Sequence, residues 1–172
     1  ACGSGGRFLI GHSDGRVCVV TDSDNEPSEK RSSPVRAICS SEQAWFSGHE
    51  SGEIISSRGW VDMSPGAVES LAMGPSGSSG SGIWGSRWNG ESASVTVLEA
   101  ADGSILLELG HHCRIRHLQS TDGNIALGDS SGGIHLVEGV VLSRRIGGIV
   151  EETEDNERRS QLMERLRRLR DT

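Results

Sequence analysis

The chain has 172 residues and a formal net charge of −7, because 24 Asp and Glu outnumber 17 Lys and Arg. This acidic balance argues against sequence-independent binding to phosphate backbones, which needs a basic surface, so a nucleic-acid partner is not expected. No stretch approaches the roughly 20 apolar residues that a membrane-spanning helix needs, so no membrane span is expected. Glycine occurs 24 times between recurring apolar runs, which predicts many tight turns rather than a disordered chain.

The N-terminal part predicts an incomplete β unit. Two short strands are expected at residues 7–10 and 16–20, around a tight turn at 11–15. Residues 1–6 are expected to form a flexible lead, so the first strand of this unit would be missing. The polar and charged residues 21–33 are expected to form an exposed loop.

Two further units are predicted in the middle of the chain. One runs from about residue 35 to 61, and the next begins near Val68. The second of these contains a Gly- and Ser-rich insertion at 74–90, which is expected to be mobile except for a short strand at 83–86. The remaining strands of that unit are expected at 94–99 and 104–109.

A meander of three strands is predicted after residue 110. Apolar runs at 115–118, 125–127 and 134–137 are separated by polar turns that are too short to do anything but reverse the chain. An outer strand is expected at 140–146. One such meander cannot bury its apolar face alone, so it has to pack against other units.

The apolar and glycine positions of these units recur along the chain. Six positions of the second unit are matched, 80 residues later, by equivalent positions of the last one, and a further copy lies halfway between them. The matched residues are Val35, Ile38, Ser40, Gly48, Gly52 and Ile54 against Ile115, Leu118, Ser120, Gly128, Gly132 and Ile134. A period near 40 residues with several short strands per unit is typical of propeller blades. We therefore predict an all-β domain over residues 1–148, a partial β-propeller of about four blades with the first incomplete.

The composition changes abruptly after this domain. Residues 149–172 are rich in Glu and Arg and carry apolar residues at helical spacing, which predicts a C-terminal amphipathic α-helix. This helix is either solvated against the propeller or a docking helix for another subunit, and we favour the second interpretation. The large aromatics of the insertion either anchor a partner or pack within their own blade. The candidate partner-binding residues are therefore Leu162, Met163, Leu166 and Leu169 of the helix, with Trp84 and Trp88 of the insertion.

Several short segments resemble a known family. Residues 68–77 are similar to the first strand and turn of a WD40-type blade, Gly110-His111 resembles the Gly-His pair before such a blade, and residues 11–17 resemble its tight inner turn. From about residue 7 to 146 the chain thus resembles WD40-type β-propellers, although quinoprotein-like propellers use similar turns. The Trp-Asp pairs that often end strands in WD40 blades are missing from the matched positions. The hydrogen-bond network of that family is therefore expected to be largely absent, so the blades would depend more on packing or on a partner.

The sequence offers little for catalysis or metal binding. In a strand His111, Cys113 and His117 would share one face, but His117 would lie about 13 Å from Cys113, too far for one metal site. Gly-x-Ser-x-Gly occurs at 11–15 and 128–132, in each case between two strands, whereas a nucleophile elbow needs a strand followed by a helix. We expect no catalytic residues, no metal and no cofactor, so the chain is not expected to be an enzyme.

Four propeller blades are at the low end of what closes a ring. The chain is therefore either part of a larger propeller or is completed by another chain. Four widely spaced cysteines without a Cys-x-x-Cys pair favour reduced thiols and an intracellular, cytoplasmic setting. We predict a non-catalytic interaction scaffold that is a subunit of a larger intracellular complex with protein partners. The alternatives are an RNA-associated subunit that uses the Arg-rich tail, and a ligand-binding or enzymatic propeller with a site at the channel mouth.

Overall fold

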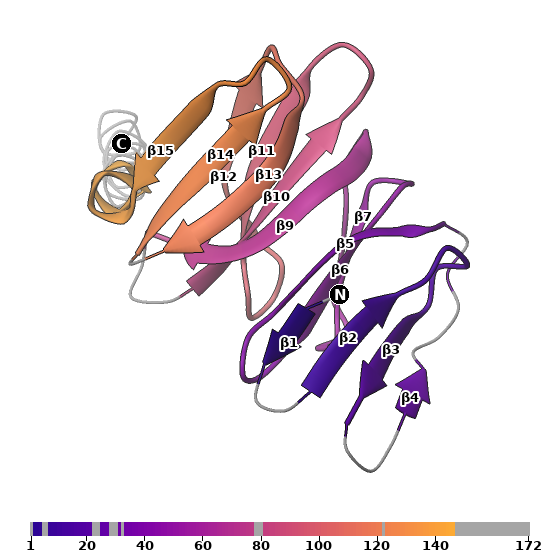
Figure 1. Cartoon of the computed structure of the whole chain (residues 1–172). Helices are drawn as coiled ribbons and strands as arrows, with labels where there is room; N and C mark the ends of the chain where they lie inside the picture. Colours follow the sequence, from indigo (N-terminus) through magenta and orange to yellow (C-terminus); the bar gives the residue numbers. More distant parts are fainter. Residues whose placement is uncertain are drawn as a thin grey trace, which may run out of the picture.

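The computed structural model describes residues 2–4, 7–21, 25–27, 31, 33–77, 81–121 and 123–146. Within these ranges the strands form four antiparallel sheets, and each sheet consists of strands that follow one another in the chain (Figure 1). We number the sheets 1 to 4 in chain order. The predicted all-β fold with about four blades is confirmed.

The strand bounds are as follows. Sheet 1 contains β1 (Cys2–Ser4), β2 (Arg7–Gly11), β3 (Val17–Val20) and β4 (Asn25–Pro27). Sheet 2 contains β5 (Val35–Ser40), β6 (Trp45–His49), β7 (Glu53–Ser56) and β8 (Val61–Met63). Sheet 3 contains β9 (Ala67–Pro75), β10 (Ser81–Trp88), β11 (Ala93–Glu99) and β12 (Ile105–His111). Sheet 4 contains β13 (Ile115–Thr121), β14 (Asn124–Asp129) and β15 (Ile134–Glu138), and helical residues 139–146 follow it.

One turn recurs at the same place in three sheets. Gly15, Gly52 and Gly132 each have a positive φ, between 86° and 96°, a conformation that glycine adopts without steric cost. In each turn the glycine N–H donates to the carbonyl three residues earlier, that of His12, His49 or Asp129. These turns join β2 to β3, β6 to β7 and β14 to β15, which confirms that a β module is repeated.

The four sheets are stacked in chain order, with sheets 1 and 4 at the two ends of the stack (Figure 1). Their first strands lie side by side, since β1 contacts β5, β5 contacts β9 and β9 contacts β13. This arrangement is that of neighbouring propeller blades around an axis.

Sheet 3 is buried on both of its faces. Ile83 and Leu98 pack in the core that it shares with sheet 2, together with Phe46 and Ile54. Their neighbours in sequence point the other way, so Trp84 and Val97 pack in the core shared with sheet 4. This double burial explains the continuous apolar run of β11, since alternation with polar residues is expected only when one face meets water.

Sheet 1 departs from the prediction at its N-terminal strand. Residues Cys2–Ser4 were expected to belong to a flexible lead, but they form β1 and pair with Arg7 to Leu9 of β2. The first blade therefore has its first strand, although it is only 3 residues long against 6 to 9 in the other sheets.

The prediction that the insertion at 74–90 is mobile also needs correction. Most of residues 74–90 lie in β9 and β10, which are 9 and 8 residues long. The two strands pair along their whole length, with Ala67 opposite Trp88 at one end and Pro75 opposite Ser81 at the other. The extra residues that the structure describes therefore lengthen a hairpin. Glycine does not prevent pairing here and allows close packing, since an added Cβ would lie 3.1 Å from the Leu98 carbonyl oxygen at Gly82 and 2.7 Å from the Ile54 side chain at Gly85.

The outer strand predicted at 140–146 is wrong, because these residues are helical. Leu142 is buried in the core between sheets 3 and 4, and Ile146, one helical turn later, packs against the same core. The 140–146 segment covers sheet 4 with an i, i+4 apolar pair where a strand would have extended it. Sheet 4 consequently has three strands among the described residues.

The remaining C-terminal predictions lie outside the described residues. They concern the helix at 149–172 and its apolar residues Leu162, Met163, Leu166 and Leu169. The domain boundary at residue 148 likewise stays a prediction. In the part of the chain that the structure describes, no helix is long and apolar enough to cross a membrane.

Candidate interaction surfaces

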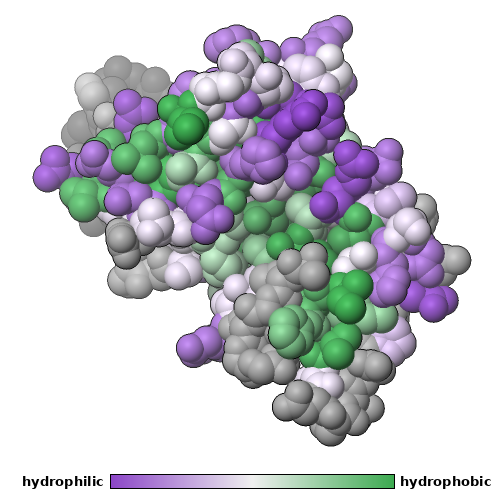
Figure 2. Space-filling view, in the orientation of Figure 1, coloured by the Kyte–Doolittle hydropathy of each residue, from purple (hydrophilic) through white to green (hydrophobic). Residues whose placement is uncertain are grey.

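The outer face of sheet 1 carries exposed apolar side chains. Phe8 is 61% exposed and Ile10 is 41% exposed, while Leu9 between them is buried on the opposite face. The register pairs Phe8 with Val20 and Ile10 with Cys18, so these four side chains share the outer face. We call this set the first end face. Figure 2 shows hydrophobic side chains gathered over β2 and β3 at this end of the molecule.

The outer face of sheet 4 has the same character. Ile134 is 81% exposed and Leu136 is 62% exposed, and their partners across the register are Gly128 and Ala126. The alternate residues Ile125 and Leu127 of β14 are buried against sheet 3. We call Ile134, Leu136 and Ala126 the second end face, and Figure 2 shows further hydrophobic side chains over β15 at this end.

The two end faces differ from the inner faces in one respect. Between neighbouring sheets the apolar side chains are packed, whereas at the ends of the stack they are exposed to solvent. In a closed propeller every blade has a neighbour on both sides, so both faces would be covered. Clustered apolar side chains on a sheet face are a marker of an interaction site.

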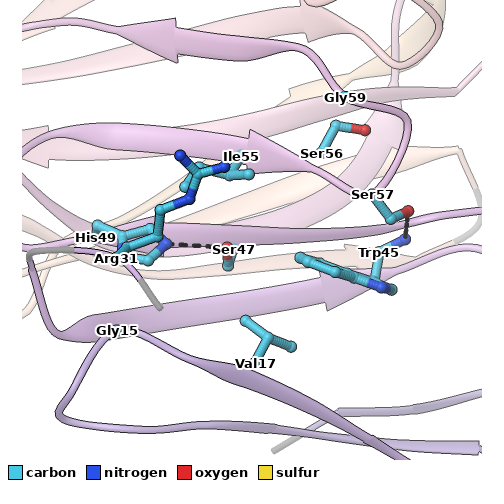
Figure 3. A pocket seen from close by; sticks show the side chains of 10 residues that line it. All are labelled: Gly15, Val17, Arg31, Trp45, Ser47, His49, Ile55, Ser56, Ser57 and Gly59. Carbon is cyan, nitrogen blue, oxygen red and sulfur yellow. Dashed lines mark hydrogen bonds between the residues drawn. The ribbon is translucent and has the colours of Figure 1, made fainter. Parts of the chain in front are cut away.

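A shallow cavity lies between sheets 1 and 2 (Figure 3). Its volume is about 190 Å³, and Val17, Trp45, Ser47, His49 and Ile55 contribute to its lining. His49 in this lining already has partners on both ring nitrogens, since its Nε2 lies 3.1 Å from Ser47 Oγ and its Nδ1 lies 2.9 Å from the carbonyl of Ser33. No lining residue among those described is acidic. The cavity therefore offers no carboxylate for acid–base catalysis.

Imidazole, carboxylate and thiol groups gather where sheets 3 and 4 meet. His111 ends β12, Asp129 ends β14 and His135 lies in β15, and one donor atom from each lies within 4.8 Å of the others. His135 Nε2 is 3.1 Å from Asp129 Oδ2. The donor atoms of His111, His112 and Cys113 also lie within 4.8 Å of one another.

This cluster was not predicted from the sequence, because its members lie on different strands. The sequence places His111 and Cys113 on one strand face with His117, whereas the fold adds Asp129 of β14 and His135 of β15. The predicted meander could have indicated part of this cluster, because its turn at 129–133 reverses the chain and brings residue 135 beside residue 129.

The two tryptophans have different surroundings. Trp84 is completely buried, and its Nε1–H donates to the carbonyl of Pro75 at 2.8 Å. Trp84 therefore packs within its own blade, and its predicted role as a surface anchor does not fit this burial. Trp88 is partly buried against the core shared with sheet 4.

Comparison with solved structures shows which fold the four sheets form. The designed protein Ika4 superposes with a TM-score of 0.66 at 18% identity, over 80% of this chain and 88% of Ika4. The chain is a partial β-propeller. The designed protein Ika8 gives a TM-score of 0.67 at 17% identity, and BBS1N, solved in complex with ARL6DN, gives 0.61 at 11% identity. These identities are low, so the likeness concerns the fold alone.

The propeller is short beside two of these structures. The alignment covers 81% of this chain but 45% of Ika8, and 76% of this chain but 45% of BBS1N. The chain therefore spans less than half of these two larger chains. No protein-family model and no curated protein matches the sequence.

Proposed function

We infer that the chain is a non-catalytic interaction scaffold whose two end faces are covered by propeller blades of another polypeptide. The observation that carries this proposal is the exposure of Phe8 and Ile10 at one end and of Ile134 and Leu136 at the other. Burying an apolar side chain of this size contributes about 1.5–3 kcal/mol. A partner that covers both faces would thus gain several such contributions and remove two sheet faces prone to aggregation.

The propeller-type neighbours support this proposal in general terms. BBS1N was solved in complex with a second protein, ARL6DN. Propellers commonly present rigid loops and blade faces to protein partners, but fold alone does not determine function. Membership of a larger intracellular complex and a relation to WD40-type propellers are parts of the same proposal, and they rest on the sequence.

The non-enzymatic role is likewise a proposal. It is supported by the cavity between sheets 1 and 2, whose described lining has no acidic residue and whose His49 is already hydrogen-bonded on both ring nitrogens. Catalytic sites usually combine a positioned acid or base with a group that it can act on. The alternative of an RNA-associated subunit depends on residues 151–172, which lie outside the described ranges.

Mass measurement of the purified chain and of charged variants tests the scaffold role. Phe8→Glu and Leu136→Glu each place a carboxylate on one end face, and Met63→Glu is the control because Met63 is 66% exposed on the outer strand β8. We expect concentration-dependent association of the unmodified chain, or capture of a protein partner. Either event should be lost in the two end-face variants and kept in the control. A chain that stays monomeric at all concentrations and captures nothing would contradict the proposal.

A further inference from the structure

We propose that His111, Asp129 and His135 form a binding site for a divalent transition-metal ion of the zinc type, with Cys113 as the fourth ligand. The site lies where the end of β12 meets the turn between β14 and β15. It is independent of the end faces, so it goes beyond the scaffold role. It rests on the positions of four side chains that the sequence places in three separate segments.

The donor atoms are already close together. One donor atom of each of His111, Asp129 and His135 lies within 4.8 Å of the other two, and the His135 Nε2 to Asp129 Oδ2 distance is 3.1 Å. Tetrahedral zinc with bonds of about 2.0–2.1 Å holds its nitrogen and oxygen ligands roughly 3.3 Å apart. The pair formed by His135 and Asp129 has nearly this separation without adjustment. The side chain of His135 is 49% exposed, so its imidazole is free to move the remaining distance toward His111.

Asp129 is held in place as a ligand by its own turn. Its Oδ1 accepts hydrogen bonds from the backbone N–H of Ser131 and of Gly133, each at 2.8 Å, and from the Ser131 hydroxyl at 2.6 Å. These bonds occupy one oxygen and direct the other, Oδ2, toward His135. The carboxylate side chain is only 4% exposed. Hydrogen bonds of this kind orient ligating carboxylates in metal sites.

His111 is oriented by the adjacent backbone. Its Nδ1 lies 2.9 Å from the carbonyl oxygen of Cys113. The Cys113 backbone N–H lies 3.1 Å from the same Nδ1 and donates to it when Nδ1 carries no proton. Binding of a metal through Nε2 selects the other tautomer, in which Nδ1–H donates to the Cys113 carbonyl and the bond from the Cys113 N–H is lost. A metal-ligating histidine typically donates its second ring N–H to a backbone carbonyl or a carboxylate in this way. The ring of His135 meets that of His111 edge-on, with the centroids 4.9 Å apart.

The fourth position falls to Cys113. His111, His112 and Cys113 also bring one donor atom each within 4.8 Å, and His112 stacks on His111 with a centroid distance of 4.7 Å. His111 belongs to both groups of donors, so the free thiol of Cys113 lies next to the histidine that they share. Two imidazoles, a carboxylate and a thiolate suit zinc, cobalt or nickel, while calcium and magnesium prefer sets of oxygen ligands.

Titration of the full chain with Zn²⁺ and Co²⁺ tests the site, after removal of bound metal with a chelator and with the thiols kept reduced. We expect one ion per chain and, with Co²⁺, the intense visible absorption of a tetrahedral site with a sulfur-to-cobalt band. His135→Ala should weaken binding by at least about tenfold, because it removes one ligand from a half-exposed position without opening the core. Asp129→Asn should have the same effect while keeping the side-chain size.

His12→Ala is the matched control, since His12 lies in the exposed turn of sheet 1, at the other end of the molecule. The Zn²⁺ affinity of the His12→Ala variant should equal that of the unmodified chain. Cys113→Ser should weaken binding and abolish the sulfur-to-cobalt band, and an unchanged spectrum would overturn the assignment of Cys113. If the unmodified chain and His135→Ala both show no Zn²⁺ binding while circular dichroism reports the same fold, then Asp129 and His135 form an ion pair without a metal and the proposal is wrong.

Discussion

Arg87 on β10 forms a buried ion pair with Asp62 on β8, across the junction between sheets 2 and 3. Its Nε donates to the carbonyl of Gly52 in the turn of sheet 2 at 3.0 Å, and another guanidinium nitrogen donates to Thr96 Oγ1 at 2.9 Å. Arg87 is 1% exposed. Burial lowers the pKa of its guanidinium, and the nearby Asp62 carboxylate opposes this shift. One side chain thus links two blades and a turn.

Loss of this pair should destabilise the propeller strongly. Arg87→Met removes the cation and leaves Asp62 with an unpaired charge that is only 11% exposed, so we expect a decrease of about 3 kcal/mol in the free energy of unfolding. Replacing Asp62 as well, with leucine, should recover much of this loss, because the uncompensated charge is then absent. Urea denaturation measures both changes. Arg58→Met is the control, since its exposed bond to Gln43 should contribute less than about 0.5 kcal/mol.

The junction between sheets 3 and 4 has a charged pair whose arginine is more exposed, while its glutamate side chain is 8% exposed. Arg114 donates two hydrogen bonds to Glu69, at 2.9 and 2.7 Å, and its side chain is 31% exposed. We expect Glu69→Gln to lower the free energy of unfolding by about 1 kcal/mol or less, because solvent reaches the arginine of this pair and screens its charge. The effect should shrink as NaCl is raised. The effect of Arg87→Met should change little with salt, so a large salt dependence there would contradict the buried pair.

Two glycines in equivalent turns should respond differently to alanine. Gly52 and Gly132 have φ values of 96° and 90°, so alanine is strained at both positions by about 1–2 kcal/mol. At Gly52 the new methyl group would also collide with the carbonyl oxygens of Ser64 and Gly66, whereas nothing lies within 4 Å at Gly132. Gly52→Ala should therefore destabilise the protein more than Gly132→Ala in thermal or urea unfolding. Equal effects would mean that the turn of sheet 2 does not pack on the connection to sheet 3.

The repeat was sufficient to predict the fold, because the repeat consists of apolar residues and turn glycines that can be recognised in each strand and turn separately. The matched apolar residues Val35 and Ile115 open the first strands of two sheets, and the turn glycines Gly52 and Gly132 recur at the same offset. Residues 140–146 were assigned to the wrong structure because the repeat favoured a fourth strand. A short apolar run does not distinguish a helix from a strand by its sequence pattern. In the folded chain the helical conformation places Leu142 in the core.

Side-chain roles that depend on a second segment were harder to predict. Trp84 lies beside Arg87 and Trp88 in sequence, a combination that is common at interfaces, yet its ring is buried under sheet 4. Arg87 of the same insertion finds its counter-charge 25 residues away in the neighbouring blade. The metal-ligand candidates Asp129 and His135 meet His111 only through the register between strands. Each of these outcomes follows from pairing between segments, which composition and periodicity do not encode.

The hydrogen bonds of Asp129 give the stability of the turn at 129–133 a dependence on pH. Bonds from the Ser131 hydroxyl, from His135 and from the Gly133 N–H hold the pKa of the Asp129 carboxyl well below its usual range. The unfolded chain has a pKa of about 3.9 at this residue, so the folded state binds the proton less readily. The ionised carboxylate therefore stabilises the fold above about pH 4, and this contribution is lost as the pH falls toward the lower pKa of the folded state.

Asp129→Asn should consequently be less stable than the unmodified chain at pH 7, and the difference between the two should narrow below about pH 4. Urea unfolding of both proteins from pH 7 to pH 3 measures this difference, and other carboxylates cancel in the comparison. A chelator in every sample keeps metal binding from contributing. A difference that stays constant over this range would show that the substituted amide disturbs the turn for steric reasons and that the charge of Asp129 does not stabilise it.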